Sequence, residues 1–222
     1  MPNESLLRQK AVEGYEKYLA GHHGFLARGL YKLQEYGAQS NYQDHLPSFL
    51  GIKFPRWIDR MVQNTNELVN IVDVGYGIGI FLLQASEKTE WKDKTHFIGY
   101  GSSLHASRPY MGQPATIDRL HAAGIQLVEG NVIDIDVQLS GIDLLVATNV
   151  LEHVKYPTWY VIQKMYRTLE SGGLGFVDNC KMAGESEDVK RYLKQSGYSF
   201  EVNIPHQTIS FQKTHPVLEL WI

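Results

Sequence analysis

Five short, almost continuous apolar runs recur along the second part of the chain and constrain its fold more than any other feature. These runs are residues 69–75, 96–101, 125–130, 142–148 and 174–179. Such runs suit strands that are buried on both faces of a parallel sheet, which only crossover helices can cover. Helix-like segments alternate with them, and these are residues 81–88, 116–123 and 157–170. The alternation predicts an α/β fold.

The last part of the chain predicts how the sheet ends. Pro157 stands at the first helical position, where its missing N–H costs nothing, and the pair Gly172-Gly173 is expected to stop that helix. After a further helix near residues 186–195, the runs YSFEVNI and HQTISFQK are separated by a short turn around Pro205. These two runs predict an antiparallel pair of strands.

Residues 1–65 differ from the rest of the chain in the spacing of their apolar residues, which is typical of helices rather than strands. Helices are expected over residues 6–20, with Ser5 as a cap, and over residues 25–36, and a turn-rich link is expected over residues 41–57. We therefore expect a helical cover over residues 1–65 and a main domain over residues 66–222, which fits a chain of this length.

Charge and cysteine content exclude several classes of protein. The 24 acidic residues outnumber the 21 basic ones, which argues against a surface that binds nucleic acid. The single cysteine, Cys180, excludes an intramolecular disulfide and fits a reducing compartment. No run approaches the roughly 18 apolar residues of a membrane span, and the polar start does not resemble a signal peptide. We expect a cytoplasmic protein without a membrane partner, and no metal site.

The run DVGYGIG, residues 73–79, stands where the first apolar run ends and a helix begins. Glycines at such a point let the backbone turn tightly and approach a ligand closely, while N–H groups of the helix face the same crevice. The spacing is G-x-G-x-G, which differs from the dinucleotide fingerprint, and no phosphate-loop lysine follows. Asp73 either accepts N–H bonds from the loop or meets a cationic part of the ligand.

In several motifs the chain resembles the class I S-adenosylmethionine-dependent methyltransferases, over most of residues 65–213. DVGYGIG is similar to their first motif, IQLVEGNVID to their third, and DLLVATNVLEHVKYP with LESGGLGFVDN to the stretch around their fourth and fifth strands. NVLEHV is especially similar to the branch of ubiquinone and menaquinone biosynthesis methyltransferases. The resemblance implies a three-layer Rossmann-like fold, with a mostly parallel seven-stranded sheet, an antiparallel C-terminal hairpin and an N-terminal helical cover.

The resemblance also implies a binding site for S-adenosylmethionine at the strand ends. The residues that it places around the methionine part are Asp73, Gly75, Tyr76, Gly77 and Gly79. Asn131 and Val132 take the positions that contact adenine, where the family usually has Asp rather than Asn. Thr148 and Asn149 take the positions under the sulfonium and beside the acceptor.

One position departs from the family pattern. The second strand normally ends in an acidic residue that binds both ribose hydroxyls, whereas here Gly101 occupies that place and is followed by Ser102 and Ser103. One or two charge-assisted hydrogen bonds of about 1.5–3 kcal/mol each are missing. Four explanations stay open: a serine substitutes, another loop supplies the contact, the site has decayed, or the cofactor is NADP, whose 2′-phosphate would suit a serine with Arg108.

Few residues are candidates for the chemistry itself. His153, just beyond the fourth strand, is the expected general base if the acceptor needs one, although a structural role in the following turn stays open. Tyr15 and Tyr18 belong to an aromatic set that either packs on the acceptor or forms ordinary core. Asn149 and His153 are the other expected substrate contacts.

The sequence thus predicts an enzyme that transfers a methyl group from S-adenosylmethionine to an O, N or C atom of a small molecule. Two alternatives stay open: a non-catalytic binding protein that keeps the fold, motivated by Gly101, and an NADP-dependent oxidoreductase. A homodimer is compatible with the sequence.

Overall fold

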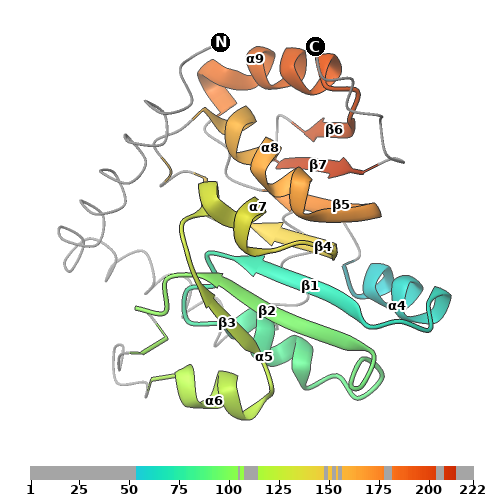
Figure 1. The fold of residues 1–222 in the computed structure, drawn as a ribbon, viewed down its shortest axis with the longest axis vertical. Coiled ribbons are helices and arrows are strands. Elements are labelled where there is room, and N and C mark those ends of the chain that lie inside the picture. Colours follow the sequence, from blue (N-terminus) through green and yellow to red (C-terminus); the bar gives the residue numbers. More distant parts are fainter. Residues whose placement is uncertain are drawn as a thin grey trace.

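The computed structural model describes residues 54–104, 106–107, 115–147, 150–151, 154, 157–177, 182–203 and 208–213. Seven strands form one sheet in the order β3-β2-β1-β4-β5-β7-β6 (Figure 1). They are β1 (Val69–Val74), β2 (Thr95–Gly101), β3 (Gln126–Glu129), β4 (Ile142–Ala147), β5 (Leu169–Val177), β6 (Ser199–Asn203) and β7 (Thr208–Gln212). The pairs among β1 to β5 are all parallel, whereas β7 is antiparallel to both β5 and β6. The predicted sheet and its antiparallel end are confirmed.

Helices cover both faces of the sheet. They are α4 (Phe54–Asn64), α5 (Ile80–Ser86), α6 (Ile117–Ala122), the 3-10 turn η1 (Val132–Asp134), α7 (Ile135–Gln138), α8 (Thr158–Thr168) and α9 (Met182–Gln195). Successive strand residues point to opposite faces. Ile71 and Val146 pack in one core with α4, α5 and α6, while their chain neighbours Val72 and Leu145 pack in the other with α7, α8 and α9. The result is the expected three-layer arrangement.

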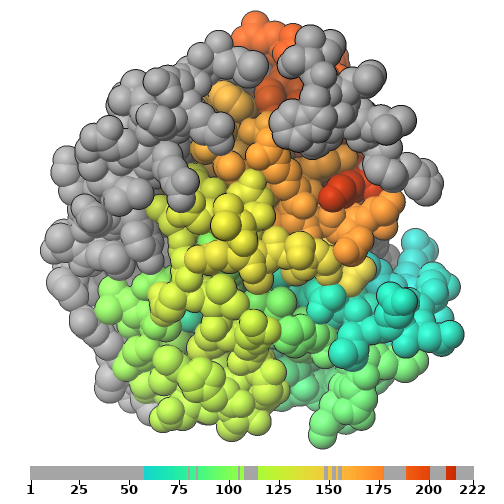
Figure 2. Space-filling view, viewed as in Figure 1, coloured from blue at the N-terminus to red at the C-terminus, as the bar shows by residue number. Residues whose placement is uncertain are grey.

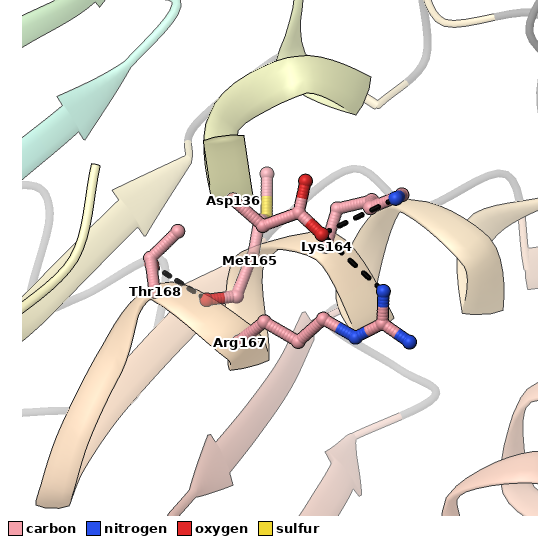
Figure 3. A network of polar contacts seen from close by, with 5 residues as sticks. All are labelled: Asp136, Lys164, Met165, Arg167 and Thr168. Carbon is pink, nitrogen blue, oxygen red and sulfur yellow. Dashed lines mark hydrogen bonds and ion pairs between the residues drawn. The ribbon is translucent and has the colours of Figure 1, made fainter. Parts of the chain in front are cut away.

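The helix α8 ends earlier than the sequence predicts. It starts after Pro157 and ends at Thr168, whose Oγ1–H donates to the carbonyl oxygen of Met165 at 2.7 Å (Figure 3). The next residue, Leu169, has an extended backbone and pairs with Ile142 of β4. The start of β5 therefore replaces the last turn that was expected of this helix.

Gly172 and Gly173 lie inside β5, so their predicted role as the helix stop was wrong. A Cβ atom on Gly173 would lie 2.7 Å from the carbonyl oxygen of Ile142. Further along β5, a Cβ atom on Gly175 would lie 2.2 Å from the ring of Phe211, its partner on β7. Both glycines are explained by the close approach of a neighbouring strand or ring.

The helix α4 begins within residues 41–57, which the sequence indicated as a link, so that part of the prediction was wrong. Its side chains Ile58 and Val62 are buried in the core, and its Asp59 accepts a hydrogen bond from Trp91 Nε1–H at 2.7 Å. Figure 1 shows α4 beside the start of β1, at the amino ends of the parallel strands. The rest of the predicted cover, residues 1–53, lies outside the described residues.

A buried ion pair joins α7 to α8. The Oδ2 atom of Asp136 lies 3.2 Å from Lys164 Nζ and 3.4 Å from Arg167 Nη1 (Figure 3). The Asp136 and Lys164 side chains are 9% and 10% exposed, whereas that of Arg167 is 46% exposed. In the space-filling view, the yellow surface of the α7 region lies directly against the orange surface of α8 (Figure 2). None of the described helices has the length and apolar character that crossing a membrane requires.

Candidate functional site

The loops after β1, β2 and β3 meet at the carboxyl ends of the parallel strands, on the left in Figure 1. The strand order reverses between β1 and β4, which are neighbours although two strands separate them in the sequence. In open α/β sheets, ligands bind outside the carboxyl ends of the strands at such a point. This edge is therefore where the predicted site residues should gather.

The glycine loop after β1 has a backbone that favours glycine. The φ angles of Gly75, Gly77 and Gly79 are 69°, 55° and 73°, all in the left-handed region. A Cβ atom on Gly75 would lie 2.5 Å from Val150, and one on Gly79 would lie 2.6 Å from Leu120. Among the described residues, no atom lies closer than 3.9 Å to a Cβ atom built on Gly77. Gly77 is thus the loop glycine that the described residues leave uncrowded.

Two other residues of the first motif are buried. Asp73 is 6% exposed and lies in β1 between Gly99 of β2 and Val146 of β4. Tyr76 is also 6% exposed, and its ring packs so closely on β2 that a Cβ atom on Gly99 would lie 2.9 Å from it. This burial favours the backbone of Tyr76 over its ring as the part that contacts a ligand.

The end of β2 lies directly against the glycine loop. The N–H of Gly75 donates to the carbonyl oxygen of Tyr100 at 2.7 Å. Gly101 has a φ of 140°, and a Cβ atom there would lie 3.3 Å from the Cα atom of Gly75. In the loop that follows, the Ser102 hydroxyl accepts from the N–H of Leu104 at 3.3 Å. One lone pair of the Ser102 hydroxyl is therefore engaged within its own loop, and its O–H can still donate.

The loop after β3 is tied to the end of β2. The N–H of Gly130 donates to the carbonyl oxygen of Gly101 at 3.2 Å, and the Tyr100 hydroxyl donates to the carbonyl oxygen of Asn131 at 2.8 Å. The side-chain oxygen of Asn131 accepts from the N–H of Ile133 at 3.3 Å and caps η1. These bonds bring Asn131 and the buried Val132 beside the end of β2, so these two predicted residues lie at the same edge as Gly101.

Thr116 is a site residue that the sequence did not reveal. Its Oγ1–H donates to the carbonyl oxygen of Ile78 in the glycine loop at 2.7 Å. Its N–H, and that of Ile117, donate to the carbonyl oxygen of Ala106 in the segment after β2, each at 2.9 Å. The start of α6 thus fixes two of the three loops. A threonine before a helix indicates only a cap, and this one makes no cap bond.

Several predicted site residues lie outside the described residues and stay predictions: Tyr15, Tyr18, Arg108, Thr148, Asn149 and His153. Val150 and Leu151, which lie between Asn149 and His153, are among the described residues. The contact of Val150 with Gly75 shows that the chain after β4 passes beside the glycine loop. Among the described residues, no group of three or more His, Cys, Asp or Glu side chains is arranged to hold a metal ion.

Solved structures similar to this chain are distant in sequence. The precorrin-6y C5,15-methyltransferase of Geobacter metallireducens is 14% identical, with a TM-score of 0.48, over 73% of this chain and 89% of that one. An S-adenosylmethionine-dependent O-methyltransferase of Thermotoga maritima is 16% identical, with a TM-score of 0.46, over 73% and 66%. A Nostoc punctiforme protein provisionally assigned as an O-methyltransferase is 14% identical, with a TM-score of 0.46, over 71% and 56%. The chain thus spans little more than half of this last relative.

Comparison with curated proteins gives no match. The family model described as a methyltransferase domain matches residues 42–215, more than three quarters of the chain. The match includes the three loops described above and both ends of the sheet. The chain therefore belongs to this methyltransferase-domain family, within the class I S-adenosylmethionine-dependent methyltransferases.

Proposed function

We propose that this chain binds S-adenosylmethionine at the carboxyl ends of β1, β2 and β3 and transfers its methyl group to an O, N or C atom of a small molecule. The observation that carries the proposal is the joining of three loops into one edge. The glycine loop is bonded to β2 through Tyr100, to α6 through Thr116 and, across β2, to the β3 loop through Gly101. These bonds hold the three loops together at the strand ends, where ligands of open α/β sheets bind.

The residues at this edge fit the three parts of the cofactor. The described residues leave room beside the loop backbone at Gly77 for the methionine part. The amide of Asn131 keeps its NH₂ donors while its oxygen caps η1, so it suits the ring nitrogens of adenine. The ribose then lies between them, close to the ends of β2 and β3.

S-adenosylmethionine, when bound, supplies an electrophilic methyl group on a sulfonium. The residues of this chain have to hold that methyl group in line with the acceptor atom and keep water out. Thr148 and Asn149 are the proposed residues beside the acceptor. Where the acceptor atom carries a proton at neutral pH, His153 is the proposed general base that removes it. Tyr15 and Tyr18 stay proposed contacts of the acceptor.

The proposal that the acceptor is a small molecule rests on the net charge and on one sequence motif. A net charge of −3 disfavours a polyanionic acceptor, and the run NVLEHV resembles the ubiquinone and menaquinone branch. The single cysteine favours the cytoplasm as the compartment. The competing proposal, a non-catalytic protein that keeps this fold, is favoured by one observation: Gly101 provides no carboxylate for the ribose.

Transfer of a labelled methyl group distinguishes the two. The protein is incubated with methyl-tritiated S-adenosylmethionine and a deproteinised small-molecule extract of the source cells, then with nucleic acid and protein fractions separately. The proposal expects tritium in the small-molecule fraction, and none when Gly77→Arg replaces the wild type. Tritium in a macromolecular fraction would refute the acceptor class, and no transfer despite cofactor binding would favour the non-catalytic protein.

A further inference from the structure

The carboxylate that is missing from the end of β2 has a counterpart on the neighbouring strand. We propose that Glu129, the last residue of β3, binds the ribose hydroxyls of the adenosyl cofactor in place of a residue at position 101. This inference rests on the proposed function. It names a binding residue that neither the family pattern nor the sequence indicates.

The backbone at the end of β2 disfavours a side chain at position 101. Gly101 has a φ of 140°, a conformation that residues with a Cβ atom rarely adopt. A Cβ atom there would also lie 3.3 Å from the Cα atom and 3.4 Å from the N atom of Gly75. The obstacle is backbone, held by the hydrogen bond from Gly75 N–H to Tyr100, so it has little freedom to move. The close packing of two loops thus explains the glycine.

Glu129 lies next to that position. The register of the parallel pair β2 and β3 makes Gly101 and Glu129 strand partners. The Glu129 side chain turns toward the β2 loop, because its Oε1 atom accepts a hydrogen bond from the N–H of Ser103 at 2.8 Å. The residue is otherwise exposed. Its carboxylate is therefore held at the loop where the family has its ribose-binding acid.

The hydrogen-bonding capacity of the Glu129 carboxylate matches that of the ribose hydroxyls. An ionised carboxylate only accepts hydrogen bonds, through two oxygens, and a ribose diol offers two O–H donors. The bond from Ser103 occupies one lone pair of Oε1 and fixes the orientation of the group. Two residues further on, Asn131 stands at the adenine position, so one short segment after β3 would hold adjacent parts of the same cofactor.

Glu129→Gln tests this role, because glutamine keeps the acceptor for Ser103 N–H and removes the charge. The control is Glu67→Gln, an exposed glutamate just before β1 at the opposite ends of the strands. Calorimetry of the full chain measures binding of S-adenosylhomocysteine and of its 2′-deoxyadenosyl analogue. We expect Glu129→Gln to raise the Kd of S-adenosylhomocysteine about 10- to 100-fold and Glu67→Gln to leave it unchanged. Glu129→Gln should raise the Kd of the 2′-deoxy analogue by a much smaller factor.

Three results would overturn the assignment. The first is the same Kd for Glu129→Gln and the wild type, and the second is an equal loss of affinity for both ligands. The third is tighter binding by Gly101→Asp than by the wild type, which would mean that position 101 accepts the family carboxylate. Thermal unfolding of each variant shows whether it is folded, and Glu129→Asp serves as the second variant if Glu129→Gln is not. If the wild type binds no S-adenosylhomocysteine, the proposed function fails and this role falls with it. Binding by the wild type with no effect at Glu129 rejects this inference alone.

Discussion

Gly101 and Glu129 are strand partners at the carboxyl ends of β2 and β3, and the Glu129 carboxylate reaches the β2 loop through the N–H of Ser103 at 2.8 Å. Position 101 lacks the acidic side chain that the family has there, and Glu129 provides one beside the same loop. The glycine at position 101 therefore does not by itself indicate a decayed site, because Gly75 packs against it and leaves little room for a side chain.

Replacement of Gly77 should abolish cofactor binding without unfolding the protein. In Gly77→Arg the side chain would enter the open space beside the loop that the cofactor needs. The matched control is Gly124→Arg, because Gly124 also has a left-handed φ, at 74°, and no described residue near a Cβ atom, but lies before β3 at the other ends of the strands. Each variant should lose about 1–2 kcal/mol of stability. Calorimetry should show no binding of S-adenosylhomocysteine by Gly77→Arg only, and normal binding would exclude the loop as the site.

The Thr116 hydroxyl should matter for affinity more than for folding. Thr116→Val keeps the shape but loses the hydrogen bond to the carbonyl oxygen of Ile78, so the glycine loop is less firmly held. A hydrogen bond of about 0.5–1.5 kcal/mol corresponds to a roughly 2- to 10-fold weaker Kd for S-adenosylhomocysteine. Thr116→Ser, which keeps the hydroxyl, should restore most of the affinity. Equal Kd values for the two variants would contradict this role.

The ion pair between α7 and α8 should be unequal in its two arms. Lys164→Met removes the arm whose side chain is only 10% exposed, leaves the buried Asp136 carboxylate without that partner, and should cost about 3 kcal/mol. Arg167→Ala removes the arm that is 46% exposed and should cost less than about 1 kcal/mol. Urea unfolding measures both values. Similar losses for the two variants would show that burial does not set the strength of this pair.

Asp143 should make the protein less stable as the pH rises. Burial raises the pKa of this carboxyl above its usual 3.8, and the charges of Glu170 and Glu67 act in the same direction, against the hydrogen bond from Asn70 N–H. An acid with a raised pKa in the folded state opposes folding once it is ionised, at pH values above that pKa. Asp143→Asn should therefore raise the Tm at pH 7, and the gain should disappear near pH 3. A lower Tm for the variant at pH 7 would contradict this effect.

The sequence predicts the parallel part of the sheet well because its strands are nearly continuous apolar runs, and the glycine spacing after β1 predicts where a ligand binds. Local patterns fail where a distant partner decides the structure. β5 starts at Leu169 because that residue pairs with Ile142, although the glycine pair indicated a longer helix. α4 begins at the end of an expected link because its later residues Ile58 and Val62 are buried in the core.

The same limit applies to the site. Thr116 acts on Ile78, which is 38 residues away, and no local pattern indicates that bond. Glu129 becomes a candidate only when the register of β2 and β3 makes it the partner of Gly101. Asp73, Gly75, Gly77 and Asn131 belong to contiguous motifs, so the sequence alone predicts them as site residues.

Calorimetric titration of the full chain with S-adenosylhomocysteine, with NADPH in a parallel titration, tests the central claim most directly. The account predicts saturable binding of S-adenosylhomocysteine at one site per chain, competition by S-adenosylmethionine, and no binding of NADPH. The absence of heat with either adenosyl ligand up to millimolar concentration, or tight binding of NADPH, would contradict it.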